Sequence, residues 1–279
     1  MAAAAEVTNM ALFCDFENVA LGVRDANYAK FDIGKVLERL LLKGSIVVKK
    51  AYCDWERYKT FKASMHEAAF ELIEIPHVRQ SGKNSADIRL VVDALDLCYT
   101  KSHVNTFVII SGDSDFSPLV SKLRENNRTV IGVGVKSSTS QLLIANCDEF
   151  IYYDDLVREQ KTRRSGRRKT PVRAEAAASA PADSEERERD KSEEDRQHEA
   201  FDLVLATIDA LVAERGEEEK IWGSMVKQTL KRRKPGFNES YYGFRSFNRL
   251  LEEAAARRLL TLERDEKSGG YLIRTPDSA

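Results

Sequence analysis

The chain has 279 residues, enough for one large domain and a small one, and 42% of them are hydrophobic, enough for buried cores. It has no apolar run of membrane-spanning length and no secretory start, so we expect a cytoplasmic protein with no membrane partner. The formal net charge of −1 excludes a chain that is basic or acidic throughout. Four isolated cysteines exclude a zinc knuckle and a redox pair, and we expect them to be reduced and buried: Cys14, Cys53, Cys98 and Cys147.

Segments of strand and helix character alternate over residues 1–156, the first expected domain. The expected strands are 10–14, 45–53, 70–78, 106–110, 129–135 and 150–153. The expected helices are 31–42, 55–69, 87–99, 117–126 and 138–146. This alternation predicts right-handed βαβ units, and therefore an α/β fold with a parallel sheet and helices on both faces.

Carboxylates follow two of these strands directly. Asp15 comes after the first strand, and Asp113 and Asp115 come after the fourth. If these strands are neighbours where the winding of the sheet reverses, Asp15 and Asp113 share one crevice, and Asp87 at the start of a helix can lean over it. Oxygen ligands of this kind suit Mg²⁺ or Mn²⁺, and such a site can activate water for phosphodiester hydrolysis.

Several of these polar residues also have a simpler structural interpretation. Asp115 can cap the helix that contains Pro118, Asp87 can cap its own helix, and Asn18 can shape a turn. Asp93 lies six residues after Asp87, about 240° around a helix, so the two side chains should not share a face. We therefore expect Asp93 to have a supporting or structural role.

Three sequence blocks, at 15–18, 83–95 and 111–116, together resemble the NYN domains of the LabA-like group, relatives of PIN-domain ribonucleases. The resemblance covers roughly residues 8–155. It implies a PIN-like fold, an RNA substrate and a metal-dependent ribonuclease activity. The implied catalytic and metal-binding residues are Asp15, Asp87, Asp113 and Asp115, and the expected supporting or substrate-contacting residues are Asn18, Ser111, Lys83 and Asp93.

Residues 157–198 separate two segments of globular character. A basic run in the first half is followed by a mainly acidic run, with few apolar residues to bury. This composition predicts a disordered charged linker. The cations that we expect to contact RNA phosphates in this segment are Arg163, Arg164, Arg167, Arg168 and Lys169.

The second expected domain covers residues 199–279. Helical patterns at 199–214, 221–232 and 242–257 precede a hairpin of strands 259–264 and 271–274, the order of a small α+β winged helix. The blocks at 242–251 and 267–273 resemble LOTUS or OST-HTH domains, which implies a module that binds RNA or docks a protein partner. Expected RNA contacts are Lys231, Arg232, Arg233 and Lys234, beside aromatic residues that either stack on bases or fill the core: Tyr241, Tyr242 and Phe244.

The functional hypothesis is a metal-dependent endoribonuclease with a C-terminal RNA-binding module. One alternative is a non-catalytic RNA-binding or scaffolding protein that keeps the PIN-like fold. Another is a Toprim-like phosphoryl enzyme, which is disfavoured because such sites are expected to carry Glu at the first strand, where this chain has Asp15.

Overall fold

The computed structural model describes residues 8–75, 85–158, 182–215, 220–265 and 270–274. The chain divides into two compact units, Met1–Gln160 and Lys161–Ala279, and each is described by itself below. Among the described helices, none combines the length and the apolar composition needed to cross a bilayer.

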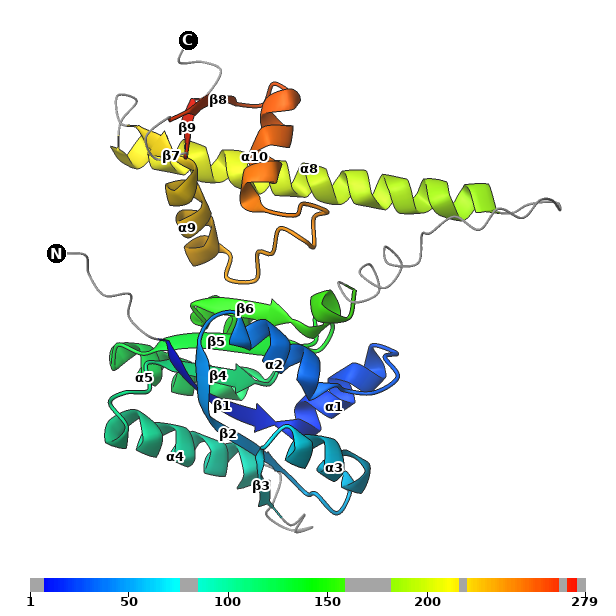
Figure 1. The fold of residues 1–279 in the computed structure, drawn as a ribbon, viewed down its shortest axis with the longest axis vertical. Coiled ribbons are helices and arrows are strands. Elements are labelled where there is room, and N and C mark those ends of the chain that lie inside the picture. The colour runs from blue at the N-terminus through cyan, green and yellow to red at the C-terminus, as the bar shows by residue number, and fades with distance from the viewer. Residues whose placement is uncertain (1–7, 76–84, 159–181, 216–219, 266–269, 275–279) are drawn as a thin grey trace. The chain divides into compact units, whose positions relative to one another are not determined.

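The first unit is built on a parallel sheet (Figure 1). Its strands lie in the order β3-β2-β1-β4-β5-β6, so β1 and β4 are neighbours at the point where the winding reverses. This adjacency confirms the condition on which a shared crevice depends. The strand bounds are β1 Asn9–Asp15, β2 Ser45–Cys53, β3 Glu71–Glu74, β4 Thr106–Ile110, β5 Thr129–Gly134 and β6 Glu149–Tyr152.

Helices cover both faces of this sheet, because the buried central strands are apolar on both sides. Leu12 of β1 packs into one core with α1 Phe16–Asp25, α2 Ile33–Leu41 and α3 Lys59–Glu67. Phe13, the next residue, packs into the opposite core with α4 Ser85–Thr100, α5 Ser117–Glu125 and α6 Gln141–Asn146. The predicted α/β fold with a parallel sheet between helical layers is confirmed.

Two helices near the candidate site differ from the prediction. Helix α1 was not expected, although Asp15 at its N-cap and Glu17 in its first turn are helix-start signals. Helix α6 begins at Gln141 rather than at residue 138, because Ser140 caps it by accepting a hydrogen bond from the backbone N–H of Leu142. Residues 136–140 are therefore a loop at the end of β5.

The second unit is a small α+β arrangement, as predicted. Its described elements are α8 Ala182–Arg215, β7 Ile221–Trp222, α9 Gly223–Arg233, α10 Phe247–Ala256, β8 Thr261–Arg264 and β9 Tyr271–Arg274. The strands form an antiparallel sheet in the order β7-β9-β8, which adds β7 to the predicted hairpin. Phe201, Val226, Leu250 and Ile273 belong to one core that joins the helices to this sheet.

The segment 157–198, predicted to be a disordered linker, is helical in its second part. Helix α8 begins at Ala182 and not near residue 199. This segment contains many Glu and Arg residues, which have high helix propensity. The prediction of disorder rested on the charge of the segment and did not take this propensity into account. The expected RNA-contacting cations of the basic run lie outside the described residues: Arg163, Arg164, Arg167, Arg168 and Lys169.

Candidate active site

Asp15 stands at the carboxyl end of β1 and is only 6% exposed. One of its carboxylate oxygens accepts a hydrogen bond from Ser111 Oγ at 2.9 Å, and the other accepts from the backbone N–H of Asn18 at 3.4 Å. Ser111 directly follows β4, so the first contact joins the ends of the two neighbouring strands. The carboxylate is thereby held in one orientation at the switch point of the sheet.

Asn18 ties α1 to the segment that follows β4. Its Oδ1 accepts a hydrogen bond from the backbone N–H of Gly112 at 2.9 Å. Asn18 lies in the first turn of a helix, so it does not shape an isolated turn, and its side chain positions the backbone that leads to Asp113. The predicted supporting residues Asn18 and Ser111 are thus brought together with Asp15.

Asp113 is partly buried and caps the short 3₁₀ helix η1, Ser114–Phe116. Its Oδ1 accepts from the backbone N–H of Asp115 at 3.0 Å, and its own N–H donates to Ser111 Oγ at 3.2 Å. Asp115 is exposed and does not cap α5, whose N-cap is Phe116. The capping role considered for Asp115 therefore belongs to Asp113 and acts on η1.

Asp87 belongs to the same electrostatic group. It is the third residue of α4 and is half-buried. Burial raises its pKa, and the negative charges of Asp113, Asp115 and Glu17 raise it further. The four carboxylates expected to form a cluster, Asp15, Asp87, Asp113 and Asp115, are therefore close enough to interact across three segments of the chain.

The pKa of Asp15 shows that this arrangement disfavours the ionised form of its carboxyl group. Burial is the largest cause that raises it, to about 7, and the charge of Asp87 adds to this effect. The hydrogen bonds from Ser111 and Asn18 favour the ionised form but do not outweigh burial and repulsion. At neutral pH, the site therefore carries negative charge that the surrounding protein does not fully compensate.

A hard divalent cation fits this donor set in its chemistry, because every acidic ligand offers carboxylate oxygen. The residues that could hold it are Asp15, Asp87, Asp113 and Asp115. In the conformation described, however, no three Asp, Glu, His or Cys side chains of the described residues are arranged so that they could hold one ion. Binding would therefore require some of these carboxylates to turn toward one another.

Glu17 lies beside this acidic group, and the sequence analysis gave it no role. It lies in the first turn of α1, and its charge contributes to the raised pKa of Asp87. Glu17 Oε1 also pairs with Nη1 of Arg57 at 3.2 Å. The useful signal was its position two residues after Asp15, on a helix that begins at the site.

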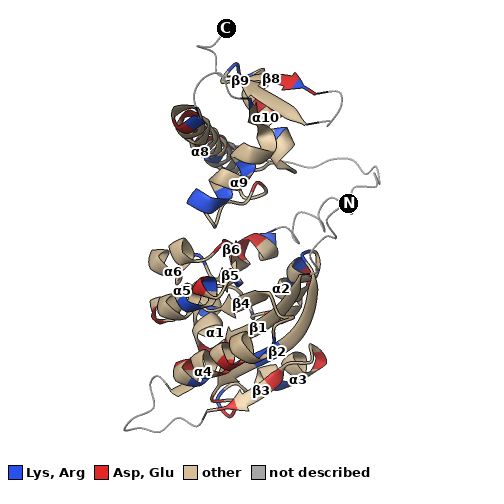
Figure 2. Ribbon diagram, turned by 90° about the vertical axis from the view of Figure 1, so that its left-hand side faces the viewer, with Lys and Arg blue, Asp and Glu red and all other residues tan. Residues whose placement is uncertain are grey.

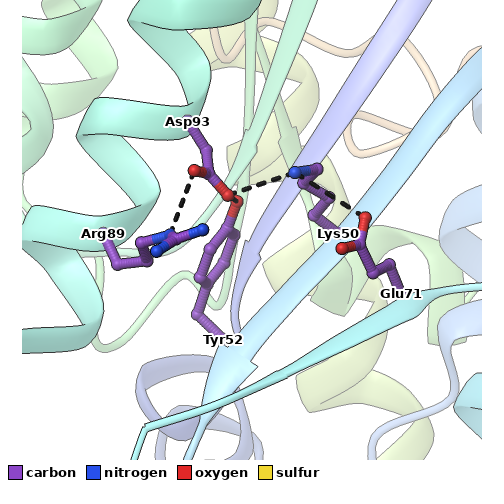
Figure 3. A network of polar contacts seen from close by, with 5 residues as sticks. All are labelled: Lys50, Tyr52, Glu71, Arg89 and Asp93. Atoms are coloured by element: carbon purple, nitrogen blue, oxygen red, sulfur yellow. Dashed lines mark hydrogen bonds and ion pairs between the residues drawn. The ribbon is translucent and has the colours of Figure 1, made fainter.

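Asp93 lies in a different network (Figure 3). Its carboxylate accepts from Tyr52 Oη at 2.9 Å, pairs with Lys50 Nζ at 3.2 Å and pairs with Arg89 Nε at 3.1 Å. Lys50 also pairs with Glu71 at 3.6 Å. These contacts join α4 to β2 and β3, so Asp93 has a structural role in fastening α4 to the sheet.

The remaining predicted site residues divide into two groups. Lys83 lies outside the described residues. Lys231, Arg232 and Arg233 form the basic last turn of α9, and Lys234 is its C-cap (Figure 2). Cations at a helix C-terminus also interact favourably with the helix dipole, which is a structural reason for their position.

The aromatic residues beside this basic turn mostly fill the core of the second unit. Tyr242 and Phe244 are each 8% exposed, and Tyr242 stacks on Phe237 with ring centroids 5.2 Å apart. Tyr241 is partly buried. The structure therefore favours core packing over base stacking for Tyr242 and Phe244.

Comparison with known proteins identifies the first unit. A family model described as the NYN domain matches residues 9–154. A solved structure of a protein of unknown function from Vibrio parahaemolyticus is 27% identical, with a TM-score of 0.49, and the match covers 55% of this chain and 98% of that one. None of the curated proteins that were compared matches the chain.

Proposed function

Because the chain belongs to the NYN domain family, we propose that it is a divalent-metal-dependent endoribonuclease that hydrolyses RNA phosphodiester bonds. NYN domains belong to the PIN-like nuclease superfamily, for which RNA is the implied substrate. The single observation that supports this proposal best is the raised pKa of Asp15, to about 7, caused by burial and by the charge of Asp87. It supports a gathering of carboxylates from separate segments at the switch point, where α/β folds bind ligands.

In this proposal, Asp15 and Asp113 would be the principal ligands of Mg²⁺ or Mn²⁺, and Asp87 and Asp115 would complete the cluster and orient water. The ion would supply charge neutralisation and an activated water for the attack on phosphorus. Ser111 and Asn18 hold Asp15 and the segment before Asp113 in place through the hydrogen bonds described above. Hydrolysis then adds water across a P–O bond, and the departing oxygen of the chain takes up a proton.

The remaining assignments belong to the same proposal. We assign the first unit to the LabA-like group and the second unit to the LOTUS or OST-HTH domains, as a module that binds RNA or docks a protein partner. The basic turn formed by Lys231, Arg232, Arg233 and Lys234 would contact phosphates, since three of these side chains are exposed. The cytoplasm is the proposed location.

The test is cleavage of labelled single-stranded RNA and DNA by purified protein, with Mn²⁺ or with EDTA. We expect RNA cleavage with Mn²⁺, none with EDTA, and a loss of about 10³-fold in Asp113→Asn, which corresponds to about 4 kcal/mol of transition-state stabilisation. Asn can still cap η1, so this variant should fold. Asp96→Asn, an exposed substitution on α4, is the matched control and should leave the rate unchanged.

Cleavage that survives Asp113→Asn would contradict the proposed site. RNA binding without cleavage at any Mn²⁺ concentration would instead support the alternative of a non-catalytic RNA-binding protein with a retained PIN-like fold.

A further inference from the structure

Along the carboxyl edge of the parallel sheet, a cation lies on either side of the acidic group. The strands β2, β1, β4 and β5 are consecutive neighbours, so the segments that follow them lie in the same order along this edge. Arg57 follows β2, Asp15 ends β1, Asp113 follows β4 and Lys136 follows β5. The acidic centre is therefore flanked by one cation on each side.

Arg57 is held beside the first turn of α1. Its backbone N–H donates to Asp54 O at 3.1 Å, which closes the turn after β2, and its guanidinium pairs with Glu17 at 3.2 Å. The Arg57 side chain is still 52% exposed. A guanidinium with one donor on Glu17 keeps further N–H groups that can bind a phosphate oxygen.

The loop 136–140 is fixed against the segment that leads to Asp113. The backbone N–H of Ser140 donates to Gly112 O at 2.9 Å. A Cβ atom at Gly112 would lie only 2.7 Å from Ser138 O, so the close approach of the two backbones requires glycine there. The loop also contacts α1, because a Cβ at Gly22 would lie 2.4 Å from Ser138 Oγ.

This fixed loop presents polar groups suited to a phosphate. Lys136, Ser137 and Ser138 are exposed. The Lys136 ammonium lies 6.0 Å from the centroid of the Tyr152 ring, and its backbone N–H donates to Asp154 at 2.8 Å. An ammonium and two hydroxyls on an anchored backbone make a hydrogen-bonding surface for phosphate oxygens.

We propose that a single RNA strand crosses this edge from Arg57 to Lys136, so that the two cations bind the phosphates on either side of the cleaved bond. The inference rests on the proposed nuclease function and adds the path of its substrate. An acidic centre repels the RNA backbone, and an ion held there would neutralise charge at the cleaved phosphate only, so the neighbouring phosphates need their own cations. Three strand spacings separate β2 from β5, about 14 Å, which is long enough for more than one nucleotide.

The first experiment measures steady-state cleavage of single-stranded RNA with Mn²⁺ for Arg57→Ala and Lys136→Ala. We expect KM to rise about tenfold in each variant, with kcat within about twofold, and the salt dependence of binding to become shallower by about 0.7 per cation removed. Arg57→Lys retains a charge and should restore most of the affinity. Lys101→Ala, in the loop before β4 at the opposite edge of the sheet, is the matched control and should leave KM unchanged.

The second experiment assigns each cation to a phosphate. RNA substrates carry one uncharged methylphosphonate linkage, either just before or just after the cleaved bond. Each neutral linkage should raise the KM of the wild-type protein about tenfold. In Lys136→Ala, a neutral linkage at one of the two positions should leave KM unchanged, and in Arg57→Ala a neutral linkage at the other position should do so. Unchanged KM in both variants, or equal sensitivity to both linkages, would overturn this path while leaving the nuclease in place. A wild-type protein that cleaves no RNA would overturn the nuclease and the path together.

Discussion

Two groups of carboxylates in the first unit are surrounded very differently. Asp93 is bound by Lys50, Arg89 and the hydroxyl of Tyr52, all within 3.2 Å. Asp15, in contrast, is bound by a hydroxyl and a backbone N–H. Within the described part of the chain, no Lys or Arg forms an ion pair with any member of the acidic group: Asp15, Asp87, Asp113 and Asp115.

The difference separates a structural carboxylate from one that is available for a cation from solution. Burying a charge is costly unless it is paired, and the network around Asp93 supplies that pairing. In the acidic group, burial and mutual repulsion instead raise the pKa of both Asp15 and Asp87. Perturbed carboxylates of this kind are typical of functional sites, which supports the proposal of a metal-dependent reaction there.

The comparison predicts opposite effects of two equivalent substitutions on α4. Asp93→Asn should lower the free energy of unfolding by about 2 kcal/mol, because Lys50 and Arg89 lose their common partner. The loss is smaller than for a fully buried ion pair, since both cations are partly exposed to solvent. Asp87→Asn should keep or slightly raise the stability of the metal-free protein, because repulsion within the acidic group falls. Urea denaturation in EDTA measures both effects.

Asp96→Asn controls for the loss of a carboxylate from the same helix, and it should change stability by less than about 0.5 kcal/mol. Catalysis should show the reverse pattern, with Asp87→Asn losing cleavage activity and Asp93→Asn retaining it at temperatures where it is folded. A large loss of stability in both Asp87→Asn and Asp93→Asn would remove the distinction between the two groups.

The sheet and the position of the acidic group could be predicted from the sequence because both depend on local patterns. Apolar strands that end in Asp15 and Asp113 imply a common edge once helices alternate with strands. Helix α1 was missed because Asp15 was interpreted only as a ligand, although a carboxylate can also act as an N-cap. Asp15 can be both a ligand and an N-cap because α1 begins directly after β1.

The partners of Asp93 could not be predicted in the same way. Helical spacing correctly separated Asp93 from Asp87, and Arg89 lies one turn before it. Lys50 and Tyr52 come from β2, however, more than 40 positions away in the chain, and their contacts depend on how α4 packs across the sheet. The loop 136–140 was likewise not predicted, because most of its Ser-rich sequence was assigned to the helix that follows it.

The acidic group also predicts how stability depends on pH in the metal-free protein. Burial and the charge of Asp87 raise the pKa of Asp15 from 3.8 to about 7, so between these values the folded state binds a proton that the unfolded state has released. Stability should therefore fall as pH rises, by about 1.4 kcal/mol between pH 6 and pH 8 from this group. Asp15→Asn, which can still cap α1, should lack this contribution in urea denaturation with EDTA. An identical pH dependence in wild type and Asp15→Asn would show that Asp15 does not titrate in this range.

The smallest expected effect isolates one hydrogen bond of the Asp93 network. Tyr52 is fully buried, and its hydroxyl donates to Asp93 at 2.9 Å. Tyr52→Phe should lower the free energy of unfolding by about 1 kcal/mol, since the carboxylate keeps Lys50 and Arg89 as partners. In the Asp93→Asn background the same substitution should cost less, because the acceptor is then a neutral amide, and a double-mutant cycle measures the difference. Equal costs in both backgrounds would mean that the hydroxyl of Tyr52 gains nothing from the negative charge of Asp93.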